Sequence, residues 1–241
     1  MSTTRFAIAT LDGPAGSGKS TLARRLAARF GWLYLDTGAM YRALALASIE
    51  AGIDPGDAVA LERLARGLDL AFEAPAHEGE AQRVVLAGRD VTSQIREPDV
   101  TARVSEVSAH AGVRAVMVSR QRDFAESGGA QGLVAEGRDM GTVVFPDARP
   151  KFFVVASLEE RAKRRYAQLR AQGVEPSYEE VLDAIAERDR KDSSRDVAPL
   201  APARDATVVE TSGRTVDEVL AWMAERVAAA SGSDVEARSH R

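Results

Sequence analysis

Short apolar runs alternate with amphipathic segments along most of the chain. Residues 5–11 are typical of a buried strand, whereas Leu22, Leu26 and Phe30 lie four positions apart, as on one face of a helix. The strands expected from this pattern are 5–11, 33–36, 132–136, 151–156 and 206–210, and the expected helical segments are 20–30, 38–51, 57–66, 98–126, 158–171, 177–192 and 215–230. Strands that alternate with helices in this way predict an α/β fold around a parallel sheet.

Residues 67–95 have a different pattern, in which apolar and polar positions alternate on either side of a turn-like segment at 73–82. This alternation predicts a small antiparallel β insertion. We therefore expect one domain over residues 1–230, with its core at about 5–66 and 98–230 and the insertion at about 67–97. The polar segment 231–241 is expected to be a disordered tail.

Composition and charge exclude several classes of protein. The net charge is −4, from 32 basic and 36 acidic side chains, so a strongly basic surface for a nucleic-acid polymer is not expected. The absence of cysteine excludes disulfides, thiol nucleophiles and cysteine-ligated metals. His77, His110 and His240 lack the spacing of metal ligands, and we expect no catalytic role for His110. Neither a signal peptide nor a membrane-spanning apolar stretch is recognised, so a cytoplasmic protein without membrane contact is expected.

Residues 13–20 (GPAGSGKS) match the phosphate-binding loop pattern G-x-x-x-x-G-K-[ST] at every defined position. Glycines in such a P-loop let backbone N–H groups surround an anion, and the following helix directs its N-terminus at the phosphates. Lys19 would reach the β- and γ-phosphates, and the Ser20 hydroxyl would ligate Mg²⁺. The residues expected to contact ATP here are Gly13, Pro14, Ala15, Gly16, Ser17, Gly18, Lys19, Ser20 and Thr21. The alternative is a flexible glycine turn that leads into a helix.

The class of P-loop protein is narrowed by what the chain lacks. It contains no asparagine, so the N-K-x-D motif with which switch GTPases read guanine is absent. Its length leaves room for one nucleotide domain and one acceptor site, which favours a small-molecule kinase.

Three further segments carry a resemblance to a known family. They are residues 36–42 (DTGAMYR), 136–147 (EGRDMGTVVFPD) and 188–200 (RDRKDSSRDVAPL). Together with the P-loop they resemble the motif set of the bacterial cytidylate kinases, a family of nucleoside monophosphate kinases, over residues 5–225. The resemblance implies a three-layer P-loop nucleoside kinase fold, with helices on both faces of a five-stranded parallel sheet, the β insertion as an enlarged monophosphate-binding region, and a short lid at about 158–173. It also implies that a monomer, acting only on small molecules, uses ATP and Mg²⁺ to convert CMP or dCMP into CDP or dCDP in pyrimidine nucleotide metabolism.

The resemblance also implies roles for individual residues. It places Thr37, Tyr41 and Arg42 in the monophosphate pocket, Ser105 and Arg114 at the cytosine, Arg138 and Asp139 at the monophosphate and base, and Arg188, Asp192 and Arg195 at phosphate and sugar. The catalytic set would be Lys19, Arg138, Asp139 and Arg188. The sequence departs from the family pattern at Thr37, where serine is common, and at Glu136, where aspartate is common; the hydroxyl is kept at Thr37.

Residues 161–170 carry five positive charges and no negative charge. We interpret this run as the lid, which would close over ATP and exclude water. The arginines expected at ATP are Arg161, Arg164 and Arg165, and the residues expected at Mg²⁺ are Ser20 and Asp36. Simpler interpretations stay open: the basic run could be a solvated helix face, residues 188–195 a surface salt-bridge network, Asp139 a cap and Tyr41 a core residue.

The hydrogen-bonding pattern of the base gives a physical account of specificity. Cytosine N4 donates and N3 and O2 accept, so Asp139 would accept from N4 and Arg114 would donate to N3 and O2. Uracil reverses the polarity at positions 3 and 4, which would leave buried groups unpaired. The alternatives are another small-acceptor kinase, for UMP, AMP or a non-nucleotide acid, and a regulatory or partner-driven ATPase.

Overall fold

The structure is a computed structural model that describes residues 6–73, 82–127, 130–171 and 173–232. Its contacts divide the chain into two compact units, the first formed by residues 1–35 with 124–241 and the second by residues 36–123. The second unit contains the predicted insertion. The predicted turn at 73–82 lies outside the described residues except at its two ends, as does the predicted tail beyond Gly232. No helix within the described ranges is long and apolar enough to cross a membrane.

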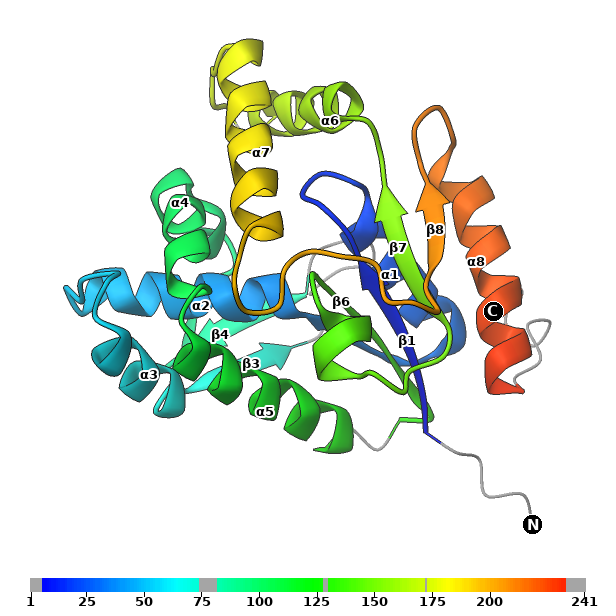
Figure 1. Cartoon of the computed structure of the whole chain (residues 1–241), viewed down its shortest axis with the longest axis horizontal. Coiled ribbons are helices and arrows are strands. Elements are labelled where there is room, and N and C mark those ends of the chain that lie inside the picture. Colours follow the sequence, from blue (N-terminus) through cyan, green and yellow to red (C-terminus); the bar gives the residue numbers. More distant parts are fainter. Residues whose placement is uncertain (1–5, 74–81, 128–129, 172, 233–241) are drawn as a thin grey trace. The chain divides into compact units, whose positions relative to one another are not determined.

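A five-stranded parallel sheet forms the centre of the first unit (Figure 1). In spatial order its strands are β2 (Leu33–Asp36), β6 (Gly132–Gly137), β1 (Ala7–Asp12), β7 (Lys151–Val155) and β8 (Thr207–Glu210). Every residue of β6 is buried, as expected for a strand covered on both faces. Asp12 lies opposite Gly137 of β6 and Phe153 of β7, so the carboxyl end of β1 is flanked by strands on both sides. Open α/β sheets bind their ligands at this edge.

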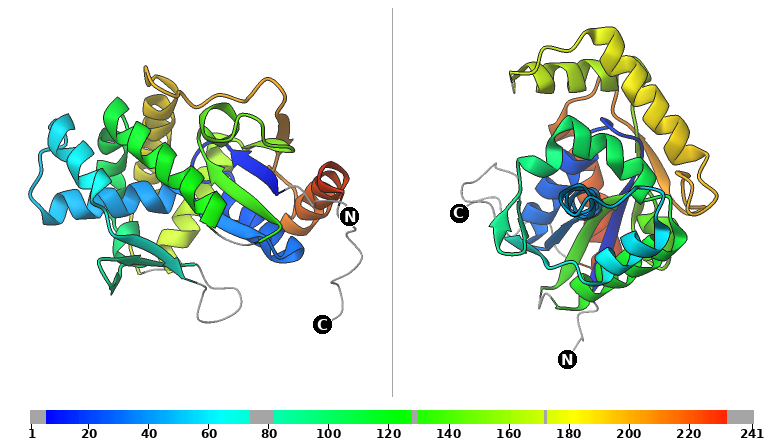
Figure 2. Two further views of the ribbon diagram at one scale, coloured as in Figure 1. Left: turned by 90° about the horizontal axis from the view of Figure 1, so that it is seen from below. Right: turned by 90° about the vertical axis from the view of Figure 1, so that its left-hand side faces the viewer.

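The second unit combines helices with a three-stranded antiparallel sheet (Figure 2). Its elements are α2 (Thr37–Glu50), α3 (Ala58–Arg66), β3 (Leu70–Glu73), β4 (Arg83–Leu86), β5 (Arg89–Asp90), the 3₁₀ turn η1 (Gln94–Arg96), α4 (Pro98–Val107) and the greater part of α5 (Ala111–Ser127). The antiparallel sheet confirms the predicted β insertion. The helical segment predicted at 98–126 is two helices, because the chain turns at residues 108–110.

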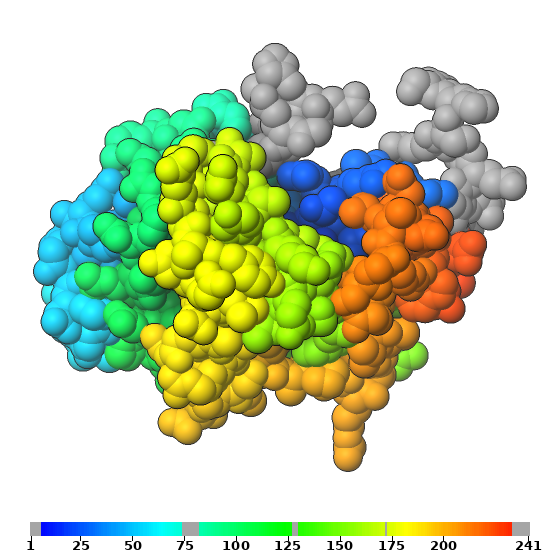
Figure 3. All heavy atoms as spheres, turned by 90° about the horizontal axis from the view of Figure 1, so that it is seen from above, coloured from blue at the N-terminus to red at the C-terminus, as the bar shows by residue number. Residues whose placement is uncertain are grey.

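The remaining helices belong to the first unit. They are α1 (Lys19–Phe30), the single π-helical turn η2 (Met140–Val144), α6 (Leu158–Ala171), α7 (Tyr178–Ser193) and α8 (Val216–Ser231). Helices α6 and α7 pack together through Ala162, Val181 and Ile185, and Figure 3 shows this pair, in yellow-green and yellow, at the surface of the molecule. The predicted lid therefore corresponds to α6 and the start of the connection to α7.

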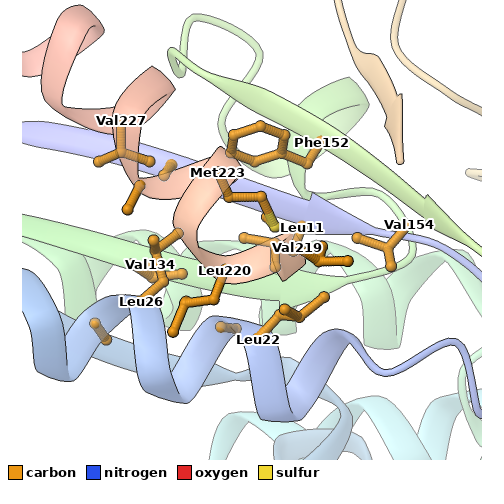
Figure 4. Close-up of a cluster of buried hydrophobic side chains, with 14 of the residues drawn as sticks. Leu11, Leu22, Leu26, Val134, Phe152, Val154, Val219, Leu220, Met223 and Val227 are labelled. Carbon is orange, nitrogen blue, oxygen red and sulfur yellow. The ribbon is translucent and has the colours of Figure 1, made fainter. Parts of the chain in front are cut away.

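An aliphatic core joins α1 and α8 to one face of the parallel sheet (Figure 4). Leu11 of β1 packs there with Leu26 of α1 and Met223 of α8, and all three side chains are completely buried. Successive strand residues face opposite sides of a sheet, so Thr10 and Asp12 of β1 face away from this core. The strand thus supports the core with one set of residues and carries buried polar side chains with the other.

Candidate active site

The P-loop starts directly at the end of β1. Gly13 has a φ of +146°, and a Cβ at this position would lie 2.1 Å from the Val154 carbonyl oxygen of β7, so no other residue fits. Gly18, with a φ of +89°, is the N-cap of α1, and Lys19 is the first residue of the helix. The sequence thus forms a tight loop from the sheet to a helix N-terminus, which is the backbone arrangement that binds phosphate.

Lys19 is a buried cation at this helix N-terminus. Its Nζ donates to the Pro14 carbonyl oxygen over 2.7 Å, within the loop itself. Burial, followed by the charge of Arg138, lowers the pKa of Lys19 to about 7; Arg188 contributes in the same direction. The carboxylates of Glu136 and Asp12 act in the opposite direction, and an anion bound beside the amine would likewise favour its protonated form.

Glu136, at the end of β6, joins the P-loop helix to β2. The Ser20 hydroxyl donates to Glu136 Oε2 over 2.8 Å, and the Tyr34 hydroxyl donates to Oε1. Hydroxyl and carboxylate oxygens are the hard donors that Mg²⁺ prefers, so Ser20 and Glu136 fit this ion. Among the described residues, no group of three or more histidine, aspartate or glutamate side chains could hold a metal. A metal here would therefore depend on substrate phosphates and water for its other ligands.

Asp192 of α7 is the acceptor for a cluster of arginines. Arg138 Nε donates to Asp192 Oδ2 over 2.8 Å, and an Arg195 terminal nitrogen lies 3.4 Å from Oδ1. Burial alone would raise the pKa of Asp192, but the charges of Arg138, Arg188 and Arg195 outweigh it and lower the pKa below its usual value. One carboxylate thus faces three guanidinium groups, and the cluster keeps a net positive charge.

Asp139 is buried, and it directly follows Arg138 of this cluster in the sequence. Its backbone precedes η2, and its carbonyl oxygen accepts from the amides of Val143 and Val144. The Asp139 side chain does not cap this turn, so the alternative role considered from the sequence is not supported. π-Helical turns are rare and occur often at functional sites.

The predicted ATP arginines of α6 make contacts with the protein itself. Arg161 is buried and donates to the carbonyl oxygens of Ala156 and Ala15, and it pairs with Asp189 of α7 over 2.6 Å. Arg164 donates to both the hydroxyl and the carbonyl oxygen of Thr211, over 3.1 and 3.0 Å. Arg161 therefore links α6 to the P-loop, and Arg164 links it to the end of β8. For these two residues, the interpretation of the basic run as a solvated helix face is wrong. Their contact with ATP stays a prediction.

Arg165, the third predicted ATP arginine, lies on the same helix and is half-buried. It donates to Gln168 Oε1 over 2.9 Å, which is a local contact within α6. Its contact with ATP also stays a prediction.

In the second unit, Asp36 and Arg42 form an ion pair at the start of α2. Asp36 Oδ1 accepts from the Ala39 amide over 2.8 Å, which caps the helix, and Oδ2 pairs with Arg42 over 3.1 Å. The Asp36 carboxylate is therefore engaged without a metal ion, and its predicted part in binding Mg²⁺ stays untested. Arg42 Nε is buried and has no hydrogen-bond partner among the described residues. An anion would supply the missing acceptor.

The other predicted acceptor residues of this unit are mostly buried. Thr37, Tyr41 and Arg114 are buried, and the Arg114 guanidinium lies 5.8 Å from the centre of the Tyr41 ring. Ser105, on α4, is half-buried. The His110 ring contacts the Pro55 carbonyl oxygen. Tyr41 is thus a core residue whose ring contacts a cation, and its predicted place in the monophosphate pocket stays a prediction.

Comparison with known proteins places this chain in a family. The family model for cytidylate kinase matches residues 9–229. The chain belongs to the cytidylate kinase family. It is 48% identical to the cytidylate kinase of Pseudomonas savastanoi pv. phaseolicola over 221 residues, which cover 92% of this chain and 95% of that protein. It is 45% identical to the cytidylate kinase of Geobacter sp. strain M21, with coverage of 91% and 92%.

Among solved structures, TT1252 from Thermus thermophilus matches with a TM-score of 0.46 and 22% identity, covering 92% of this chain and 96% of that one. The family assignment comes from the family model and the sequence relatives.

The cytidylate kinase motifs led to most of the residues described above, but not to all. Asp12 received no role from the sequence, although it ends a buried apolar strand directly before the P-loop, a position where a charge is unusual. For Tyr34 the sequence predicts only a place in the strand at 33–36. Glu136 was noted as a departure from the family pattern, and its two hydroxyl partners now give it a defined place.

Proposed function

We propose that this protein transfers the γ-phosphoryl group of ATP to CMP or dCMP, which gives ADP and CDP or dCDP. The observation that best supports this proposal is that, besides burial, the charges of Arg138 and Arg188 lower the pKa of Lys19, so both arginines lie near the P-loop lysine. Lys19 belongs to the P-loop, whereas the two arginines come from the β6–η2 connection and from α7. Within the first unit, the lysine expected at the donor phosphates therefore lies near arginines expected at the acceptor phosphate.

Phosphoryl transfer depends mainly on positioning and on neutralising negative charge. On the donor side, the amides of the P-loop and the charged amine of Lys19 would bind the β- and γ-phosphates of ATP. On the acceptor side, Arg138, Arg188 and Arg195 would hold the monophosphate, since a guanidinium can bind two phosphate oxygens at once and stays charged. The positive charge that the three arginines retain beside Asp192 suits an anionic acceptor.

The second unit would contribute further acceptor contacts. The Nε atom of Arg42 is buried and has no hydrogen-bond acceptor among the described residues, and a phosphate oxygen would provide one. Arg114 and Asp139 would read the cytosine by donating to N3 and O2 and accepting from N4. Thr37, Tyr41 and Ser105 are proposed to complete this acceptor site. We propose that the enzyme acts as a monomer in the cytoplasm and on small molecules alone.

Ser20 and Glu136 would hold Mg²⁺ together with the nucleotide phosphates, and Asp36 is a further proposed contributor. When bound, the ion would neutralise part of the phosphate charge.

We expect chelation by EDTA to abolish CDP formation, and excess Mg²⁺ to restore it. Glu136→Gln should raise the Mg²⁺ concentration required for half-maximal rate, whereas Glu225→Gln, at an exposed position of α8, should not. Full activity in EDTA would contradict the metal requirement.

A panel of acceptors tests the proposed substrate. ADP formation from ATP should be rapid with CMP and dCMP and slow with UMP and AMP, because uracil and adenine do not match the donors and acceptor proposed for cytosine. A coupled assay for ADP measures all four acceptors under the same conditions. A preference for UMP or AMP would replace the proposal with the corresponding kinase, and ATP hydrolysis that is indifferent to every acceptor would indicate an ATPase.

A further inference from the structure

Asp12 is a buried acidic residue that the proposed chemistry does not use. It is the last residue of β1, it is 4% exposed, and the P-loop begins at the next residue. Strand alternation turns its side chain away from the core formed with α1 and α8. A charged side chain in such a position needs partners, and their identity shows what it does.

Both carboxylate oxygens of Asp12 accept hydrogen bonds from the start of η2. The Met140 amide donates to Oδ1 and the Gly141 amide to Oδ2, each over 2.8 Å. These two amides directly follow Arg138 and Asp139 in the chain. One side chain therefore fixes two successive peptide groups, and with them the backbone from which the two proposed acceptor residues extend.

The turn also lies unusually close to β1. A Cβ at Gly141 would be 3.1 Å from the Thr10 hydroxyl oxygen, 3.1 Å from Lys151 Cδ and 3.4 Å from Asp12 Oδ2. Such distances are tighter than ordinary van der Waals contact. The absence of a side chain at Gly141 thus lets its amide reach the Asp12 carboxylate.

The charge at Asp12 is costly to the fold. Burial raises the pKa of Asp12 to about 6, although the two amide hydrogen bonds and Lys19 act in the opposite direction; the nearby Asp139 raises it further. The folded protein thus binds a proton at Asp12 more readily than the unfolded chain does, so stability falls as the pH rises from 3.8 to about 6, and the full cost of the ionised form is present above pH 6. A group that weakens the fold in its ionised form is a candidate for a functional role.

We propose that Asp12 is a positioning residue for phosphoryl transfer. Its carboxylate fixes the η2 turn against the end of β1. Because Arg138 and Asp139 directly precede this turn, their positions relative to the P-loop, which starts at Gly13, are fixed as well. Asp12 touches neither substrate in this proposal, which rests on the proposed CMP kinase function. Small displacements of positioned groups slow catalysis strongly, so loss of this link should appear in turnover.

Asp12→Asn tests the proposal, because the amide keeps the size of the side chain but presents an N–H group to one of the two backbone donors. We expect kcat with CMP to fall about tenfold or more, while the affinity for ATP in the absence of CMP stays within about threefold. The matched control is Thr10→Val, two residues earlier on the same face of β1. The Thr10 hydroxyl is buried and has no hydrogen-bond partner among the described residues, so this variant should keep wild-type kcat.

Gly141→Ala provides a second test that does not alter the P-loop strand. Its methyl group would push η2 from Asp12, and the same pattern is expected: reduced kcat with CMP and unchanged ATP affinity. Calorimetric ATP titration and steady-state kinetics on folded protein, checked by thermal unfolding, measure all variants. Wild-type kcat in folded Asp12→Asn or Gly141→Ala would overturn the proposal, as would an equal loss of ATP affinity. If wild-type protein makes no CDP, the proposed function has failed instead.

Discussion

Replacing Lys19 with methionine is expected to lower kcat/KM for CMP phosphorylation about a thousandfold. Lys19 is buried, carries the positive charge of the P-loop, and has a pKa that burial, followed by the charge of Arg138, lowers to about 7. Methionine fills a similar volume without a charge, so the β- and γ-phosphates would lose the group that neutralises them as the bond to the γ-phosphoryl group breaks. Steady-state kinetics with ATP and CMP measure the effect.

Thermal unfolding separates this loss from a loss of structure. A buried lysine with a pKa of about 7, against 10.5 in its ordinary state, binds its proton less readily in the folded protein. Its charge therefore costs stability at low pH, and that cost diminishes as the pH rises from 7 towards 10.5. Lys19→Met should consequently unfold at the same temperature as the wild type or higher.

Arg29→Met is the control for Lys19→Met, because it removes one positive charge from the exposed last turn of the same helix. This control should retain wild-type kinetics. Near-normal turnover in Lys19→Met would contradict the assignment of residues 13–20 as the donor-phosphate site.

Replacing Asp139 with alanine is expected to lower kcat/KM for CMP about a hundredfold, since a hydrogen bond to a charged group contributes roughly 1.5–3 kcal/mol. Asp139 is buried, and cytosine N4 would lose its acceptor. Affinity for ATP should stay within about threefold, because the P-loop contacts are unchanged. Discrimination between CMP and UMP should also narrow, since the acidic acceptor is the group that opposes the uracil O4 carbonyl.

Asp147→Ala is the matched control for Asp139→Ala. It removes the same charge from an exposed position eight residues further along the chain, and it should leave kinetics with CMP unchanged. An equal loss of ATP affinity and CMP use in Asp139→Ala would show that the residue supports the whole site rather than the acceptor.

The local elements were predictable because their patterns are local. Leu22, Leu26 and Phe30 define one face of α1, and the buried run at 132–136 defines β6. The sheet order β2-β6-β1-β7-β8 was not predictable in this way, because it depends on how each connection crosses the sheet.

The P-loop was predictable for a different reason. Its function depends on backbone conformation, and the glycines that allow this conformation are part of the sequence pattern. Gly13 is one of them, because a Cβ there would collide with β7.

Long-range contacts set the limit of prediction at the candidate site. Asp12 contacts Met140 and Gly141 across 128 and 129 positions of the chain, and no periodicity reports such a pairing. Arg161 shows the converse: its position in a basic run indicated exposure or a nucleotide contact, yet the fold buries it against the P-loop. Residue type and spacing therefore identified the chemistry, whereas the supporting contacts required the structure.

The most direct test of the central claim follows the phosphoryl group itself. ATP labelled at its γ-phosphorus is incubated with the protein, Mg²⁺ and CMP, and the products are separated. We predict that the label appears in CDP, as its β-phosphoryl group, in an amount equal to the ADP formed. Label that appears in inorganic phosphate, with CMP unchanged, would contradict the assignment of this protein as a CMP kinase.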